Sequence, residues 1–106
     1  MKSQHEKVQE KIREIKEEMQ RIGLWQEESL PEEAYDYTLA YARDRMAFHQ
    51  WLQFIFIPQV QEMLQDYEEL PRTSQVGKAA ESAFEDWDQG EQLVQLLKEF
   101  DLLMTG

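Results

Sequence analysis

The segment from Phe48 to Val60 most constrains the fold of this chain, because it is the most apolar stretch and polar sequence flanks it on both sides. At 3.6 residues per turn, its large apolar side chains fall on one wide stripe that continues to residue 64. The stripe comprises Phe48, Trp51, Leu52, Ile55, Phe56, Met63 and Leu64. Phe54, Ile57 and Val60 widen it beyond half of the helix circumference. Such a helix must be covered on several sides, which predicts the central member of a small antiparallel bundle of about four helices.

Two other interpretations of this segment are weaker. The run Phe-Ile-Phe-Ile at 54–57 is rich in residues that favour strands, but no second segment offers a strand to pair with it. The unbroken apolar run is only these four residues long, against about 20 that span a bilayer, so we expect no membrane insertion.

Pro58 lies inside the predicted helix and has no N–H to donate to the carbonyl of Phe54. We therefore expect a kink at this position, or a break with Pro58 starting a new turn. The simpler interpretation is architectural. The alternative is that the freed Phe54 carbonyl accepts a hydrogen bond from a partner or ligand.

The charge of the chain is strongly negative and unevenly distributed. Its 106 residues carry a net charge of −11. Residues 1–23 have six basic and five acidic groups, residues 24–71 have two and ten, and residues 72–106 have three and seven. A surface of this sign repels phosphate backbones, so we expect no direct binding of nucleic acid. It suits a basic protein partner, although a solvated acidic surface is the simpler alternative.

Length and cysteine content set further bounds. A chain of 106 residues can build one core, so residues 1–106 are predicted to form a single helical domain. Without cysteine there is neither a disulfide framework nor thiol chemistry. No basic leader followed by an apolar run is visible, so we expect a cytoplasmic protein.

The hydrophobic periodicity predicts three further helices. Residues 1–22 carry one apolar seam, with Ser3 as N-cap, Glu6 as its capping-box partner and Gly23 as a left-handed stop. A bundle helix is favoured over an intermolecular coiled coil, because the seam is short. The third helix is predicted over 74–87, capped by Ser74 or Thr73 and with Phe84 and Trp87 facing inward, and the fourth follows Asp88 and Glu91 as its capping pair.

Residues 26–47 are predicted to form an acidic loop around Pro31, with one or two helical turns near Leu39 and Tyr41. Asp44 precedes Phe48 by four residues and is a candidate cap for the helix that follows. A loop of this length in a small domain is often functional or flexible.

The residue types and spacings of most catalytic or cofactor sites are missing. The serines have no nucleophile-elbow context, and His49 is the one histidine away from the N-terminal end of the chain. Neither histidine has a glutamate three positions before it, as a di-metal helical bundle requires. No Gly-rich phosphate loop occurs. We therefore expect a non-enzymatic protein without a metal or other cofactor.

A group of polar residues lies beside the apolar stripe. The polar members are Asp44, Arg45, Gln50 and Gln53, and the aromatic residue Trp51 lies among them. One interpretation is structural: Gln53 bonds a loop backbone and Arg45 pairs with a carboxylate. The alternative is that this group lines a shallow groove for a partner or ligand, because Trp and Arg dominate interface hot spots.

The run of residues 44–58 resembles the signature of the YqcC-like family of small bacterial proteins. That signature reads D-x-M-x-F-x-Q-W-L-Q-x-x-x-I-P, and its structural positions here are Phe48, Leu52, Ile55 and Pro58. Trp25, Pro31 and Leu70–Pro71 follow the expected order, whereas Gln59 stands where the family usually has Arg. The resemblance implies an all-α bundle from a bacterial cytosol and no particular activity. It also implies a genetic association with a tRNA pseudouridine synthase in some members.

These observations lead to a protein-interaction or accessory module, with a nucleic-acid-modifying enzyme as one possible kind of partner and a homodimer as another. The alternative is a small-ligand-binding helical domain, with a pocket where residues 26–47 cross the central helix.

Overall fold

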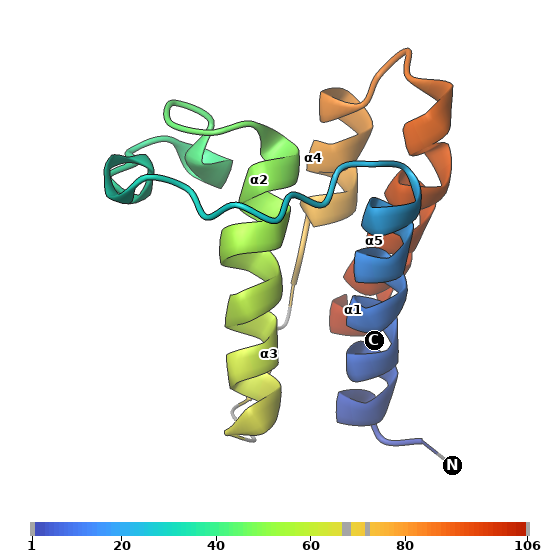
Figure 1. The fold of residues 1–106 in the computed structure, drawn as a ribbon. Helices are drawn as coiled ribbons and strands as arrows, with labels where there is room; N and C mark the ends of the chain where they lie inside the picture. The colour runs from blue at the N-terminus through green and yellow to red at the C-terminus, as the bar shows by residue number, and fades with distance from the viewer. Residues whose placement is uncertain (1, 67–68, 72, 106) are drawn as a thin grey trace.

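The part of the chain that the structure describes is helical and contains no strand. The computed structural model describes residues 2–66, 69–71 and 73–105. Its elements in chain order are α1 (Gln4–Arg21), the 3-10 turns η1 (Glu32–Tyr35) and η2 (Ala40–Ala42), α2 (Phe48–Trp51), the π-helical turn η3 (Leu52–Phe56), α3 (Ile57–Gln65), α4 (Val76–Ala83), the 3-10 turn η4 (Asp88–Gly90) and α5 (Glu91–Thr105). The long elements run in alternating directions (Figure 1), which confirms the all-α antiparallel fold.

Both ends of α1 follow the sequence pattern. The Ser3 hydroxyl accepts a bond from the Glu6 N–H at 3.2 Å, as the predicted N-cap requires. At the other end Gly23 adopts φ +80°, and the Leu24 N–H donates to the Met19 carbonyl at 2.8 Å. This is a Schellman ending, and it needs a residue that tolerates the left-handed region.

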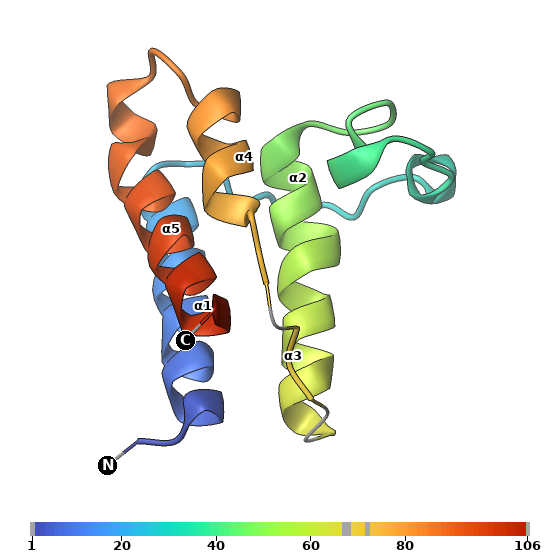
Figure 2. The ribbon, with the colours of Figure 1, turned by 180° about the vertical axis from the view of Figure 1, so that it is seen from behind.

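Helices α2, η3 and α3 form one continuous rod, residues 48–65, that is seen from both sides in Figures 1 and 2. Just before Pro58, the Ile57 N–H donates to the Leu52 carbonyl in a wide π-type turn. Pro58 therefore falls in the first turn of α3, where its missing N–H costs little. Of the two outcomes expected at this proline, the structure takes the new turn.

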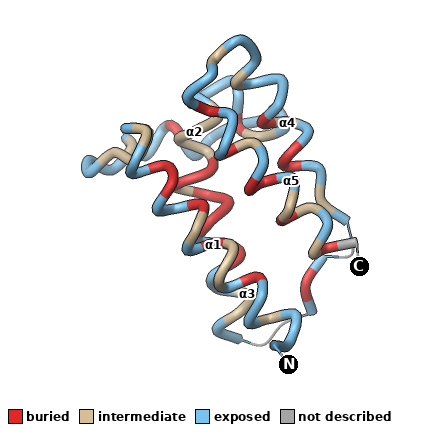
Figure 3. Tube along the Cα trace, turned by 90° about the vertical axis from the view of Figure 1, so that its right-hand side faces the viewer, coloured by how far each residue is buried: buried red, intermediate tan, exposed pale blue. Residues whose placement is uncertain are grey.

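The core lies where the rod faces α1, α4 and α5. Helix α5 packs against both α1 and α4, and the rod adds Leu52, Phe56 and Val60 to the same cluster. Buried and exposed residues alternate along the trace with helical spacing (Figure 3). Leu52, Ile55 and Phe56 are buried, as predicted, whereas Phe48 is half-buried and Pro58 is exposed.

Helix α4 is shorter than predicted. It ends at Ala83, and the turn that follows contains Asp86 in the left-handed region at φ +65°, so 74–87 is not one helix. Its first N–H groups bind the Asp101 carboxylate of α5, at 3.1 Å for Val76 and 2.8 Å for Gly77. The prediction that Thr73 caps this helix was wrong, because the N-cap position is Gln75 and the capping carboxylate is that of Asp101. The prediction for Ser74 was incomplete. Its hydroxyl lies 3.5 Å from the Val76 N–H and donates its own hydrogen bond to Asp101.

The capping pair predicted for the last helix was also wrong. Asp88 is the first residue of η4, which runs directly into α5, and Trp87 precedes it without a side-chain cap. Gly90 is buried under Trp87, where a Cβ atom would lie 2.8 Å from the indole Cε3. The glycine thus lets the Trp87 ring lie on the backbone between α4 and α5.

Candidate protein-docking face

Residues 30–46 form a lobe that projects from the upper end of the rod, on the side away from α1 and α5 (Figures 1 and 2). The inner side of the lobe is apolar and packs on the rod. Ala34, Ala42, Met46 and Ile55 form a second buried cluster, and Leu30 and Trp51 pack against it. The lobe is therefore anchored on the rod by an apolar cluster of its own.

Asp44 braces the lobe from within. Its carboxylate accepts bonds from the Thr38 N–H and hydroxyl, both at 3.0 Å, and from the Leu39 N–H at 3.2 Å. These bonds, that of the Thr38 N–H first, lower the pKa of the Asp44 carboxyl. The prediction that Asp44 caps the central helix was wrong, because the N-cap of α2 is Ala47 and its N–H is bound by the Gln50 side chain at 2.8 Å.

Gln53 and Gln50 hold the chain that leads into the lobe. Gln53 is 7% exposed and clamps the Gln26 backbone: its Nε2 donates to the carbonyl at 2.6 Å, and its Oε1 accepts from the N–H at 3.0 Å. Gln50 Nε2 donates to the Gln26 side-chain oxygen at 3.1 Å. Gln53 therefore bonds a loop backbone, which was the structural interpretation of this residue. These bonds and the apolar cluster lie at the crossing where a small-ligand pocket is the alternative prediction, and that alternative stays a prediction.

Two consecutive residues of the lobe adopt an unusual backbone conformation. Tyr41 has φ +58° and Ala42 has φ +52°, both in the left-handed region. Such a conformation costs a non-glycine residue about 1–3 kcal/mol. Ala42 is fully buried, so the packing of the lobe on the rod holds this conformation in place.

The lobe carries exposed aromatic and apolar side chains, and we call the set Tyr35, Tyr37 and Leu39 the lobe patch. Their exposed fractions are 45%, 37% and 44%. The neighbouring carboxylates of Glu32, Glu33 and Asp36 are exposed as well. The lobe patch was not among the predicted site residues, although large side chains at alternate positions in an acidic loop are a sequence signal that indicates it.

Trp51 belongs to a row of aromatic rings that connects the lobe to the turn between α4 and α5. Its ring centroid lies 4.9 Å from that of Tyr41 and 5.7 Å from that of Phe48. The row continues from Phe48 to Phe84 at 5.7 Å and from Phe84 to Trp87 at 5.8 Å. All five rings are half-buried, so each leaves part of its surface to solvent.

The predicted site residues therefore divide into two groups. Gln50 and Gln53 are engaged with Gln26, and Asp44 is engaged with the lobe backbone, so these three position the surface. Trp51 lies within the aromatic row. Arg45 is exposed on the lobe, and no described carboxylate forms an ion pair with it.

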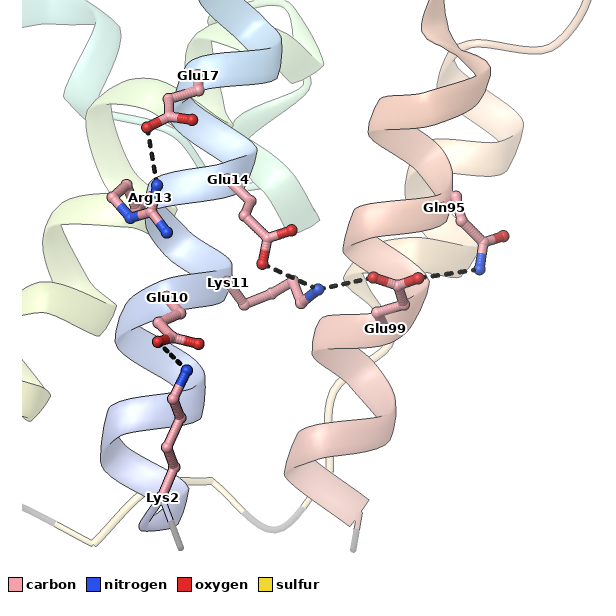
Figure 4. Close-up of polar contacts among 8 residues, drawn as sticks. All are labelled: Lys2, Glu10, Lys11, Arg13, Glu14, Glu17, Gln95 and Glu99. Atoms are coloured by element: carbon pink, nitrogen blue, oxygen red, sulfur yellow. Dashed lines mark hydrogen bonds and ion pairs between the residues drawn. The ribbon is translucent and has the colours of Figure 1, made fainter.

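The basic side chains of α1 are largely paired within the molecule. Lys11 lies 2.7 Å from Glu99 of α5 and 3.3 Å from Glu14, and Arg13 lies 3.1 Å from Glu17 (Figure 4). Lys2 pairs with Glu10 and Arg21 with Glu18. The Lys11 bond lowers the pKa of the Glu99 carboxyl. Four of the six basic residues in segment 1–23 are thus paired within the molecule, which reduces the basic surface of this segment.

Among the described residues, no group of three or more His, Asp or Glu side chains is placed to hold a metal ion. None of the described helices combines the length and the apolar character that a membrane crossing requires.

Comparison with known proteins places the chain in a family. Residues 7–103 match the model of the family DUF446, whose description reads tRNA pseudouridine synthase C. A protein of Haemophilus influenzae, named only as an uncharacterized protein, is 30% identical over 76 residues, which cover 72% of each chain. No solved structure matches the chain. Because the family model covers nearly its whole length, this chain belongs to the DUF446 family.

Proposed function

We propose that this chain is a non-catalytic interaction module that binds a basic protein through its lobe, and that the partner is an enzyme acting on tRNA. The observation that carries the proposal is the lobe patch, in which Tyr35, Tyr37 and Leu39 are exposed next to exposed carboxylates. Tyrosine gives large contact area at low entropic cost, and carboxylates around it favour a basic surface.

The choice of a tRNA enzyme rests on the family description, which names a tRNA pseudouridine synthase. The similarity of residues 44–58 to the YqcC-like signature supports the same association. An enzyme that binds tRNA must present basic surface to the phosphates. A chain with a net charge of −11 is repelled by tRNA itself but attracted by such an enzyme.

The direct test is a binding titration of this chain with the tRNA pseudouridine synthase of the same organism, at low and at high salt. We expect binding that weakens as salt rises and that falls at least tenfold in the double variant Tyr35→Ser/Tyr37→Ser. Leu102→Ser is the matched control, because Leu102 is 70% exposed on α5, outside the lobe, and its replacement should leave the affinity unchanged.

Two results would contradict the proposal. One is the absence of binding at low salt. The other is conversion of uridine to pseudouridine in tRNA by this chain alone, which would make it a catalyst. If light scattering instead shows a homodimer that the lobe variant dissociates, the lobe is an interface between two copies and the proposed partner is wrong.

A further inference from the structure

The turn between α4 and α5 holds a groove of mixed polar and apolar lining outside the lobe. We call it the corner groove; it is a hollow of about 400 Å³ whose apolar part is formed by Phe84, Trp87 and Val94. All three are half-buried. Gly90 and Phe84 support the Trp87 ring from below, since a Cβ at position 90 would stand 2.8 Å from Trp87 Cε3 and 3.2 Å from Phe84 Cβ.

Charge identifies the kind of occupant. The rim of the corner groove carries Glu85, Asp86, Asp88 and Glu91, and none of these four forms an ion pair with a described lysine or arginine. A fifth rim carboxylate, Glu81, is already paired with Lys98. An apolar floor beneath unpaired carboxylates is complementary to a long side chain with a cationic end.

The aromatic floor adds to this complementarity. A guanidinium or ammonium group within about 6 Å of an indole centroid is attracted by the ring, and tryptophan is the strongest partner of this kind. The same chain already uses this contact elsewhere, with Lys16 Nζ 5.1 Å from the Trp25 ring centroid. Trp87 has no such cation among the described residues.

We propose that the corner groove receives an arginine or lysine side chain from the basic partner protein, with its charged end over Trp87 and between the rim carboxylates. The aromatic row from Tyr41 through Phe48 and Phe84 connects this groove to the lobe, so one partner can contact both. The inference rests on the proposed function, since it names a second contact of the same partner.

The test uses hexa-arginine amide as the probe and the indole N–H signals of the three tryptophans in a nitrogen–proton NMR spectrum as the readout. We expect the Trp87 signal to move saturably with the peptide and to return with added salt. The Trp25 signal should stay in place, because Lys16 already lies over that ring. Hexaglutamate should move neither signal.

Two variants separate the groove from general charge. Glu85→Gln/Asp88→Asn/Glu91→Gln should weaken the peptide response at least tenfold, whereas the matched variant Glu27→Gln/Glu28→Gln/Glu62→Gln, which removes three exposed carboxylates elsewhere, should weaken it less than twofold. Gly90→Ala should also weaken the response, because the new methyl group displaces the Trp87 ring. Heat-induced unfolding of each variant checks that the fold is intact.

No saturable movement of the Trp87 signal would overturn the inference, and so would equal losses in the two charge variants. The outcome is separable from that of the proposed function. If the synthase binds through the lobe while Trp87 does not respond, the corner groove is not a contact. If Trp87 responds to the peptide but no synthase binds, the groove stands and the partner is wrong.

Discussion

Gln53 shows how one buried polar residue can fix a long segment. Its amide makes both hydrogen bonds that the Gln26 backbone offers, across 27 positions of sequence. Removing it would leave the N–H and the carbonyl of the half-buried Gln26 without this partner, and a fully buried group left unsatisfied costs about 1–3 kcal/mol.

We therefore expect Gln53→Ala to lower the free energy of unfolding by about 1–3 kcal/mol in urea denaturation. Gln59→Ala is the control: Gln59 is exposed on the same rod, and its replacement should change stability by less than about 0.5 kcal/mol. Equal, small effects of the two substitutions would show that the clamp does not stabilise the fold.

His49 is a second residue whose contribution to stability can be measured, through the pH dependence of unfolding. It is half-buried on α2, and burial lowers the pKa of its imidazole below the ordinary value of 6.5. Between the folded pKa and 6.5 the unfolded chain binds more protons than the native one, so the free energy of unfolding rises with pH in this window. The stabilisation is complete above 6.5 and is lost on acidification through the folded pKa.

His49→Gln should therefore flatten the pH dependence of stability between about pH 5 and 7. Urea denaturation at pH 5.5 and pH 7.5 on both proteins measures the effect. An unchanged difference between the two pH values in the variant would show that His49 does not contribute.

At the scale of elements, the close approach of α4 to α5 depends on Gly77. A Cβ atom at this position would lie 2.6 Å from the Lys98 Cα, which is backbone and cannot move aside cheaply. Alanine is the better helix former by about 1 kcal/mol, so propensity and packing oppose each other here. Overpacking costs about 1–3 kcal/mol, and a backbone contact lies at the upper end of that range.

We expect Gly77→Ala to destabilise the protein by at least about 1 kcal/mol in chemical denaturation. Ser82→Ala on the exposed side of the same helix should be neutral or slightly stabilising. A Gly77→Ala protein as stable as the wild type would mean that α4 can shift away from α5 at no cost.

The elements that the sequence predicted well are those whose signals are local. The apolar stripe of the rod, the seam of α1, its Ser3 cap and its Gly23 stop are all read from residues within a few positions of one another. The prediction failed where a distant residue decides. Asp101 caps α4 from 25 positions away. At Asp44 two local partners compete, and its carboxylate binds the Thr38 backbone, not the start of the helix at Phe48.

The candidate site was predictable to a similar extent. Trp51 was found as an aromatic member of the apolar stripe, and the glutamines were found because they border it. The sequence did not predict that Trp51 joins the aromatic row while Gln50 and Gln53 bind Gln26, because this depends on where residue 26 crosses the rod. The end of α4 at Ala83 could not be predicted from the sequence either. Phe84 and Trp87 continue the helical spacing of apolar residues, although the helix ends before them.

At the scale of the whole molecule, charge and aromatic surface combine at one end. The lobe and the corner groove are joined by the aromatic row, and both are rimmed by carboxylates. Four of the six basic residues in segment 1–23 are paired within the molecule, as Figure 4 shows for Lys2, Lys11 and Arg13, so this segment offsets the field only in part. The arrangement is the physical basis of the proposed attraction to a basic protein and the proposed repulsion from tRNA.

Hydrogen exchange of this chain, with and without the tRNA pseudouridine synthase, tests that arrangement most directly, because it reads every backbone amide of the bound module. We expect slower exchange in residues 35–46 and around residues 84–88, and no change along the outer face of α1. Binding that protects α1 while leaving residues 35–46 unchanged would contradict the assignment of the lobe as the docking face.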